Sequence, residues 1–457
     1  MATGWAPDAP ETTVHPAVAF SAKRRDRLAA MFEGRTLVVP SGALKVRSND
    51  TDYRFRPGSD FYYLTGCDEP DAVLVITPGP GGPRTTLYVA ARRDHTTHEF
   101  FTSARYGELW VGRRRGVAEA AVHYAIETAP LEHLEKDLGS LDVDTVLVRR
   151  EIDERVDVMV PPHDADGELA EALGEMRLTK DEFEVGALQH AVDATIKGFE
   201  DVVRALPSAE LRGERVIEGV FNLRARVEGN DVGYSTIAAA GADATVLHWV
   251  PNNGRVRRGD LLLLDAGVEG PHLYTADVTR TLPVNGTFSP AQRRVYELVL
   301  AAADAGIAAV RPGASFRASN QAAMAVLAEG LYEMGILGEE PARALRHDRQ
   351  VYRRYTLHGV SHSLGLDVHD CDEARDEVHF GELAEGHVIT VEPGLYFQAH
   401  DLTVPEEYRG IGVRIEDDVL VTATGARNLS AALPRGADEV EAWMAALWAT
   451  GTTDLRL

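Results

Sequence analysis

The 457-residue sequence has little cysteine, a deficit of positive charge and no long apolar run. It contains two cysteines, too few for a disulfide framework, and this number favours a reducing, cytoplasmic location. Its formal net charge of -24 is the opposite of what a phosphate-binding surface needs, so we expect no nucleic-acid partner. No stretch is apolar enough to span a bilayer and no signal peptide is readable, so we expect no membrane association.

Sequence patterns divide the chain into two domains near Arg177. From residue 20 to residue 176, short apolar runs alternate with helical patterns such as 117–127, which predicts an α/β domain with a largely parallel sheet. We expect residues 1–19 to be a flexible N-terminal segment and residues 177–457 to form a second, larger domain. The strand-like runs of the first domain are Thr36–Pro40, Ala72–Ile76, Thr86–Ala90 and Asp144–Val148.

The larger domain contains the same order of predicted helices and strands twice. Thr179–Glu182 has the pattern of a capping box that opens a long helix ending before Pro207, and a second helix follows at Glu214–Glu228. Ser289–Gln292 caps another long helix, and a proline-containing break separates it from a helix that runs to about Gly335. Two strand-like segments follow each helix pair. We therefore expect an α+β domain with an internal pseudo-twofold repeat.

Four acidic residues of this domain lie on those strand-like segments. Asp265 ends a run of four leucines, and Asp277 lies in a β-rich stretch a short turn later, so both belong to one hairpin. Glu392 ends a similar run just before a Pro-Gly turn. Strand alternation places Glu416 on the same face as Arg414, which can then contact the carboxylates.

A loop containing three histidines, His358, His362 and His369, adds imidazole to these acids. Four carboxylates buried together with His362 cost many kcal/mol unless cations neutralise them. We therefore predict two divalent ions held by these side chains. Carboxylates with a single imidazole suit Mn²⁺ better than Zn²⁺ or Ca²⁺, although cobalt or zinc could occupy the same cage.

The segments that carry these residues resemble the pita-bread metallopeptidases, and most closely the aminopeptidase P family. The N-terminal stretch Tyr53–Gly66 is similar to the signature of that family's N-terminal domain. The resemblance implies an α/β N-terminal domain followed by a pita-bread catalytic domain. One departure is a hairpin about one residue longer, with Gly270-Pro271 at its tip, where insertion is tolerated. In the second domain the resemblance rests on Asp265–Gly267, Asp277–Thr281, His358–Asp370, Glu392–Gly394 and Arg409–Asp418.

The resemblance implies an Xaa-Pro aminopeptidase, which removes the first residue of a peptide whose second residue is proline. The nucleophile would be a hydroxide that bridges the two metal ions. In this family pattern Asp277 and Glu416 bridge the ions, Asp265 chelates one of them, and His362 and Glu392 chelate the other.

The resemblance also implies roles beyond metal binding. Glu392 would take the proton of the attacking water and pass it to the leaving nitrogen. His248 and His369 would hold the substrate carbonyl and stabilise the oxyanion. Trp110 stands where a family tryptophan reaches a neighbouring subunit's site, so we expect a homo-oligomer, a dimer or a tetramer. The pocket beyond the scissile bond would be lined by His358, Arg414 and Tyr396.

Other interpretations remain open at this stage. A prolidase has the same ligands and differs in accepting only Xaa-Pro dipeptides. A metal-free interaction protein of the same fold would have lost ligands, and methionine aminopeptidases lack an N-terminal domain of this kind. Cys371 lies near the site in sequence and is interpreted as a small buried filler. The segment Arg343–Arg354 matches the family poorly and could shape a pocket wall.

Overall fold

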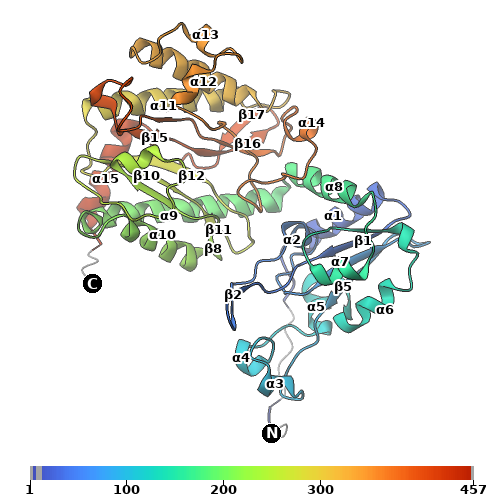
Figure 1. The fold of residues 1–457 in the computed structure, drawn as a ribbon. Coiled ribbons are helices and arrows are strands. Elements are labelled where there is room, and N and C mark those ends of the chain that lie inside the picture. Colours follow the sequence, from blue (N-terminus) through green and yellow to red (C-terminus); the bar gives the residue numbers. More distant parts are fainter. Residues whose placement is uncertain (1–3, 7–12, 454–457) are drawn as a thin grey trace. The chain divides into compact units, whose positions relative to one another are not determined.

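The chain divides into two compact units, Met1–Met176 and Arg177–Leu457, in a computed structural model that describes residues 4–6 and 13–453 (Figure 1). Of the segment 1–19 predicted to be flexible, residues 1–3 and 7–12 lie outside the described residues. Helix α1 begins within this segment, at Val18. None of the helices in the described part of the chain has the length and apolar character needed to cross a membrane.

The first unit is built on a five-stranded sheet in the order β6-β5-β4-β1-β7. Strand β4 pairs antiparallel with β1 and with β5, and only the β1–β7 and β5–β6 pairs are parallel. The prediction of a largely parallel sheet was therefore wrong. The connection 78–83 between β4 and β5 is too short for a crossover helix, so these strands form a hairpin.

The elements of the first unit are short, and strand β6 was not predicted because it starts at the end of the region assigned to a helix. The strands are β1 (Thr36–Pro40), β2 (Val46–Ser48), β3 (Thr51–Asp52), β4 (Val73–Thr77), β5 (Arg84–Val89), β6 (Glu127–Pro130) and β7 (Val146–Val148). The helices are α1 (Val18–Met31), α2 (Ser59–Thr65), α3 (Glu99–Thr102), α4 (Glu108–Val111), α5 (Val117–Tyr124), η1 (Leu131–His133), α6 (Leu134–Leu138), η2 (Val143–Thr145), α7 (Glu154–Met159) and α8 (Asp166–Leu178).

The second unit consists of two similar halves, as the repeat predicted. Each half begins with a helix pair and continues into a three-stranded antiparallel sheet, β12-β10-β9 in the first half and β13-β16-β17 in the second. Figure 1 shows the strands lying between the α9–α10 pair and the α11–α12 pair. The two halves therefore meet along their sheets, where the acidic residues lie.

The first half contains α9 (Glu182–Arg212), α10 (Glu214–Glu228), β8 (Asp231–Val232), β9 (Ile237–Ala240), η3 (Gly241–Thr245), β10 (Leu261–Ala266), β11 (Val268–Glu269) and β12 (Val278–Pro283). The second half contains α11 (Pro290–Ala309), α12 (Ala318–Glu333), α13 (Pro341–Ala344), η4 (Val351–Arg354), α14 (Asp376–His379), β13 (Val388–Val391), β14 (Gly394–Tyr396), η5 (Glu406–Tyr408), β15 (Gly412–Arg414), β16 (Asp417–Thr422) and β17 (Gly425–Asn428). Helix α15 (Ala437–Thr450) follows the second half.

Helix α9 begins later than predicted. Its N-cap is Asp181, and the capping box is closed by Glu184 rather than by Glu182. The backbone of Thr179 instead forms an isolated bridge with His387, which keeps it out of the helix. The predicted cap of α11 is confirmed, because Ser289 and Gln292 form its capping box.

Helix α9 also continues past Pro207, so the prediction that it ends before the proline was wrong. A proline inside a helix lacks the N–H that would bond to the carbonyl four residues earlier, here the carbonyl of Val203. The indole Nε1 of Trp448 in α15 donates to that carbonyl oxygen at 2.7 Å. A side chain distant in sequence thus replaces the missing donor, and the helix runs on to Arg212.

Backbone and side-chain hydrogen bonds join the two halves where β12 meets the segment before β16. The amide of Glu416 donates to the carbonyl of Thr279 at 3.1 Å. The hydroxyl of Thr281 donates to the carbonyl of Arg414 at 3.0 Å. The fully buried guanidinium of Arg280 donates to the Asp417 carboxylate at 2.8 Å and to the Glu416 carbonyl at 2.6 Å. These contacts fix the backbone on both sides of the candidate site.

Candidate metal centre and active site

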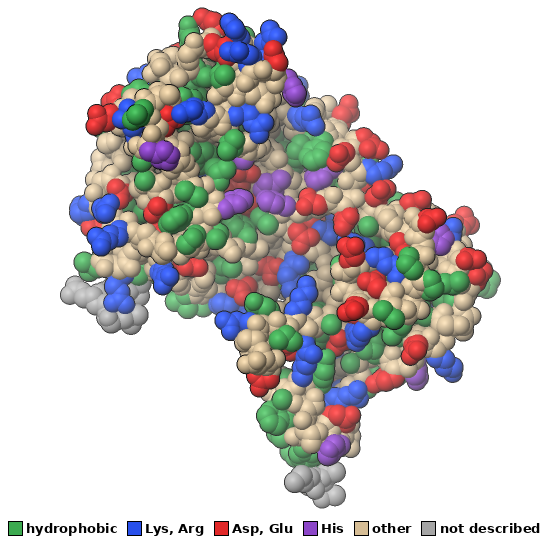
Figure 2. All heavy atoms as spheres, in the orientation of Figure 1, with side chains coloured by type: hydrophobic (Ala, Val, Ile, Leu, Met, Phe, Trp, Pro, Cys, Tyr) green, Lys and Arg blue, Asp and Glu red, His purple; other side chains and the backbone are tan. Residues whose placement is uncertain are grey.

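A cavity of about 640 Å³ lies in the second unit, and both halves of the unit supply its walls. Every residue assigned above to the site lines this cavity, except Tyr396 and Trp110. Figure 2 shows histidine side chains gathered on this face of the unit, with acidic and apolar side chains around them. The lining residues are Tyr234, Ser235, Ile237, Leu247, His248, Val250, Asp265, Asp277, His358, Gly359, Ser361, His362, Val368, His369, Glu392, Arg414 and Glu416.

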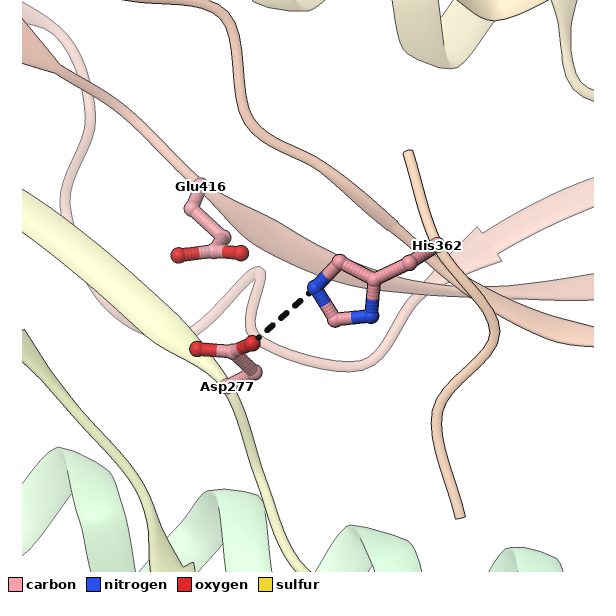
Figure 3. Close-up of side chains that lie close together, drawn as sticks. All are labelled: Asp277, His362 and Glu416. Atoms are coloured by element: carbon pink, nitrogen blue, oxygen red, sulfur yellow. Dashed lines mark ion pairs between the residues drawn. The ribbon is translucent and has the colours of Figure 1, made fainter. Parts of the chain in front are cut away.

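Three of the predicted ligands converge most closely. Asp277, His362 and Glu416 each offer one ligand atom, and these atoms lie within 4.8 Å of one another. Figure 3 shows the three side chains pointing toward a common space, with His362 Nε2 at 3.3 Å from Asp277 Oδ2. Glu392 lies beside them, with Oε1 at 3.5 Å from the same nitrogen of His362.

The His362 ring is held so that Nε2 faces the acids. Its Nδ1 lies 3.1 Å from the carbonyl oxygen of Ser363, to which it donates. The backbone at His362 lies beside β13, because its carbonyl oxygen accepts from the amide of Thr390 at 3.0 Å. A neutral ring in this setting carries its lone pair on Nε2, as a metal ligand requires.

Asp265 is held by two donors at the end of β10. The hydroxyl of Tyr234 donates to its Oδ1 at 2.6 Å, and the guanidinium of Arg414 donates to its Oδ2. Arg414 also donates to the hydroxyl of Tyr396 at 3.0 Å. The contact between Arg414 and the carboxylates follows the strand alternation. Tyr234 was not identified from the sequence, because it is distant in sequence from every ligand segment and belongs to no motif.

The carboxylate of Glu416 has one oxygen that the protein does not satisfy. Its Oε2 accepts from the Thr279 hydroxyl at 2.7 Å, whereas its Oε1 is buried without a hydrogen-bond partner among the described residues. Burial raises the pKa of Glu416 well above its usual range and also raises that of Asp265. The guanidinium of Arg414 forms an ion pair with Asp265. A divalent cation therefore fits this donor set, because it would satisfy the oxygen and balance the excess negative charge.

Burial and neighbouring charges also adjust the groups around the ligands. Burial raises the pKa of Glu392 to about 7, with a further increase from Asp277. Burial lowers the pKa of His362, but the carboxylates of Asp277 and Glu392 outweigh it and raise that pKa to about 9. Burial and the Arg414 charge lower the pKa of His358 to about 4, so this ring is neutral at pH 7.

Two of the remaining candidates, His369 and Tyr396, lie around the same space. The ring of His369 is 4.4 Å from that of His362, centroid to centroid, and burial lowers its pKa. Tyr396 lies behind the wall, with its hydroxyl 2.8 Å from His358 Nε2. Trp110 belongs to the first unit, where it lies on α4 with 58% of its surface exposed. The segment Arg343–Arg354 contributes no residue to the cavity wall, so the interpretation that it shapes this pocket is not supported.

A buried ion-pair cluster secures the loop that carries His362 and His369. The carboxylate of Asp370 accepts from Lys180 Nζ at 2.9 Å and from the guanidinium of Arg177, and its amide donates to the Ser363 carbonyl at 2.9 Å. The neighbouring Cys371 is buried, and burial raises the pKa of its thiol, which fits its interpretation as a filler.

Replacing Lys180 with methionine is expected to destabilise the second unit by roughly 1.5–3 kcal/mol, because the buried Asp370 carboxylate loses one charged donor and keeps Arg177. Burial alone would raise the pKa of Asp370, but Arg177 and Lys180 outweigh it and hold that pKa below its usual range. The contacts of Asp370 with Arg177 and Lys180 therefore stabilise the folded state fully above the unfolded pKa of Asp370, about 3.9, and this stabilisation is lost as the pH falls below that value. Denaturant unfolding at pH 7 and near pH 3 measures both effects.

The matched control is Lys197→Met, because Lys197 is 53% exposed and pairs with Glu228 at 3.2 Å on the surface. Its loss is expected to cost at most about 1 kcal/mol. Equal effects of the two substitutions would show that the Lys180–Asp370 pair contributes no more than a surface pair.

Both units of the chain match families of known proteins. Residues 186–423 match metallopeptidase family M24, and residues 21–146 match the aminopeptidase P N-terminal domain. The chain is 54% identical to Xaa-Pro aminopeptidase 1 of Streptomyces coelicolor, over 98% of this chain and 91% of that protein. It is 33% identical to the Xaa-Pro aminopeptidase of Escherichia coli, over 93% of this chain and 97% of that protein.

Solved structures with a similar fold cover nearly all of the chain. An aminopeptidase from Pseudomonas aeruginosa superposes with a TM-score of 0.84 at 30% identity, covering 96% of this chain and 100% of that one. Zinc-substituted aminopeptidase P of Escherichia coli in complex with product gives a TM-score of 0.83 at 31% identity, covering 95% and 99% of the two chains.

Proposed function

The chain belongs to metallopeptidase family M24, with an aminopeptidase P N-terminal domain ahead of its pita-bread catalytic unit, and on this basis we propose that it is an Xaa-Pro aminopeptidase. It hydrolyses the bond between an N-terminal residue and a following proline. The observation that carries this assignment is the convergence of the predicted ligands in one cavity of a chain that matches such enzymes over almost its full length. The named relatives are Xaa-Pro aminopeptidases, which does not favour a prolidase.

Five side chains are assigned to hold two divalent ions. Their oxygen-rich set with one imidazole suits Mn²⁺. The unpartnered oxygen of Glu416 and the close approach of the ligand atoms support this assignment. When bound, such ions polarise a scissile carbonyl and make a water molecule acidic enough to attack it near neutral pH. The assigned ligands are Asp265, Asp277, His362, Glu392 and Glu416.

Glu392 is assigned as the group that moves the proton. It accepts a proton from the attacking water and releases it to the prolyl nitrogen as the bond breaks, and its carboxylate lines the cavity 3.5 Å from His362 Nε2. His248 and His369, which line the same cavity, are assigned to donate hydrogen bonds to the substrate carbonyl oxygen as it gains negative charge. The neutral ring of His358, linked to Tyr396 and through it to Arg414, shapes the pocket beyond the scissile bond.

A dedicated pocket for proline has a physical basis. An Xaa-Pro bond has no N–H on the proline side, so an enzyme that binds its substrate as an added strand loses a hydrogen bond there. A site that reads the ring and the substrate carbonyl avoids this loss. The acids around Asp265 would attract the free α-amino group, which restricts cleavage to the first residue.

The cellular setting is proposed from weaker observations. Both cysteines are free and buried, which supports a cytoplasmic location that cell fractionation can test. We also propose a homo-oligomer, a dimer or a tetramer, in which the exposed Trp110 contacts a neighbouring subunit near its site. Sedimentation of the intact chain and of a Trp110→Ala variant tests this assembly.

The function is tested with matched peptides. Xaa-Pro-Yaa tripeptides should lose their first residue at least roughly 10²-fold faster than Xaa-Ala-Yaa counterparts, because a pocket built for the ring discriminates at this level. Mass spectrometry of the products identifies the bond that is cut. Xaa-Pro dipeptides as the preferred substrates would indicate a prolidase. Cleavage that persists after complete removal of divalent ions would contradict the metal-dependent mechanism.

A further inference from the structure

One wall of the cavity is the loop 241–254, the first part of the connection 241–260 between β9 and β10, which carries Leu247, His248 and Val250. No hydrogen bond joins the ring of His248 to another described residue. Its position therefore depends on the backbone of its loop. A displacement of about 1 Å at a group that contacts the substrate can cost about 10²-fold in rate. The anchor of this loop is thus a determinant of the site.

The anchor is the carboxylate of Glu214, which is fully buried at the first residue of α10. Its Oε1 accepts from the amide of Ala240 at 2.7 Å, at the end of β9. Its Oε2 accepts from the indole Nε1 of Trp249 at 2.8 Å and from the amide of Gly254 at 2.6 Å. One carboxylate therefore joins the residue before the loop, its last residue and the side chain next to His248.

The close approach at Gly254 shows how tightly the loop is packed against this carboxylate. A Cβ atom at Gly254 would lie 2.7 Å from Glu214 Oε1 and 2.2 Å from an oxygen of Asp243. A residue with a side chain would push the loop away from its anchor. The sequence thus keeps a glycine where the loop returns to Glu214.

Other contacts hold different parts of the loop. The Asn252 side chain accepts from the amide of Ala238 at 2.9 Å and donates to the carbonyl of Thr236 at 2.8 Å. Gln398 donates to the carbonyl of Thr245 at 2.8 Å. Among these contacts, the hydrogen bond to Glu214 is made by Trp249, the residue next to His248.

We propose that Glu214 is a positioning residue for catalysis, which acts through Trp249 to hold His248 at the substrate carbonyl. The proposal rests on the proposed function, since it takes His248 as a group that contacts the substrate. Glu214 does not line the cavity and takes no part in the chemistry itself. Its effect on turnover should therefore disappear when His248 is absent.

A double-mutant cycle tests this coupling. Trp249→Phe removes the indole donor and keeps an aromatic ring, and it is expected to lower kcat/KM for an Xaa-Pro-Yaa peptide about 10-fold. In a His248→Ala background the same change should have an effect of at most about twofold, because the positioned group is gone. Equal losses in both backgrounds, or no loss in the wild-type background, would overturn the proposal. Glu214→Gln, examined in the same two backgrounds, gives an independent cycle if one variant folds poorly.

Hydrogen exchange supplies a measurement that does not depend on activity. Trp249→Phe should increase amide exchange in 241–254 and leave 358–370 unchanged, whereas general destabilisation would raise both. Unchanged exchange in 241–254 would also overturn the proposal. Trp443→Phe, a half-buried tryptophan of α15, is the matched control. Failure of the proposed function is distinguishable, because the wild-type chain would then not cleave Xaa-Pro peptides. The exchange result would still decide whether the bond from Trp249 to Glu214 holds the loop.

Discussion

Replacing Glu392 with glutamine is expected to lower kcat for an Xaa-Pro-Yaa peptide by at least about 10³-fold, within the range that general acid–base catalysis contributes. The glutamine side chain has nearly the same size and keeps one oxygen that can bind a metal ion, but it cannot accept the proton of the attacking water. The carboxylate of Glu392 lines the cavity beside His362, where it is placed to take and return the proton of the attacking water. Steady-state kinetics with and without added Mn²⁺ measure the loss.

The control for this experiment is Glu385→Gln, which makes the same change at an exposed residue in the turn before β13. Its kcat should equal that of the wild type. Metal content must be measured in parallel, because Glu392 is also an assigned ligand. A Glu392→Gln protein that retains both ions and turns over within tenfold of the wild type would exclude the proton-transfer role.

Glu416→Gln is expected to change stability in opposite directions with and without divalent ions. In chelated protein the variant should be at least as stable as the wild type, because it removes one buried carboxylate from a group of four. With Mn²⁺ added, the wild type should gain about 2.7 kcal/mol when the free ion is 100 times its Kd. The variant should gain less, since it has lost a charged ligand.

Thermal unfolding of both proteins with chelator and with Mn²⁺ gives the four melting temperatures that this prediction needs. Elemental analysis should find two ions per wild-type chain and fewer in the variant, with cleavage of Xaa-Pro-Yaa peptides falling at least about 10²-fold in the variant and in chelated wild type. A variant that is less stable than the wild type by the same amount in both conditions would indicate that Glu416 serves packing rather than ion binding. Glu385→Gln again provides the unaffected reference.

The sequence predicts the parts of the site that depend on local pattern. A run of four leucines ending in Asp265, and a similar run ending in Glu392, specify buried strands that deliver an acid to a turn. Alternation along one strand-like segment correctly placed Arg414 beside the carboxylates. The two-half architecture followed from the order of helix caps and strands. The strands that carry the acids and the position of Arg414 each depend on a few consecutive residues, whereas the two-half architecture depends on the order of such local signals along the domain.

The features that were missed depend on contacts between distant residues. Where α9 passes through Pro207, an indole from the last helix donates to the freed carbonyl, and no local rule predicts that donor. The mixed sheet of the first unit arises from a hairpin within an otherwise alternating pattern. Tyr234 and Glu214 are single polar residues without a motif, and their roles become visible only when the chain has brought Asp265 and Trp249 to them.

The division of the ligands between two halves has a consequence for biosynthesis. Asp265 and Asp277 leave the ribosome before His362, Glu392 and Glu416, which all belong to the second half. The assigned ligand set is therefore incomplete until the second half has been synthesised. A nascent chain exposes its early acids without their partners, so binding of a divalent ion by the whole ligand set would require the second half to close onto the first.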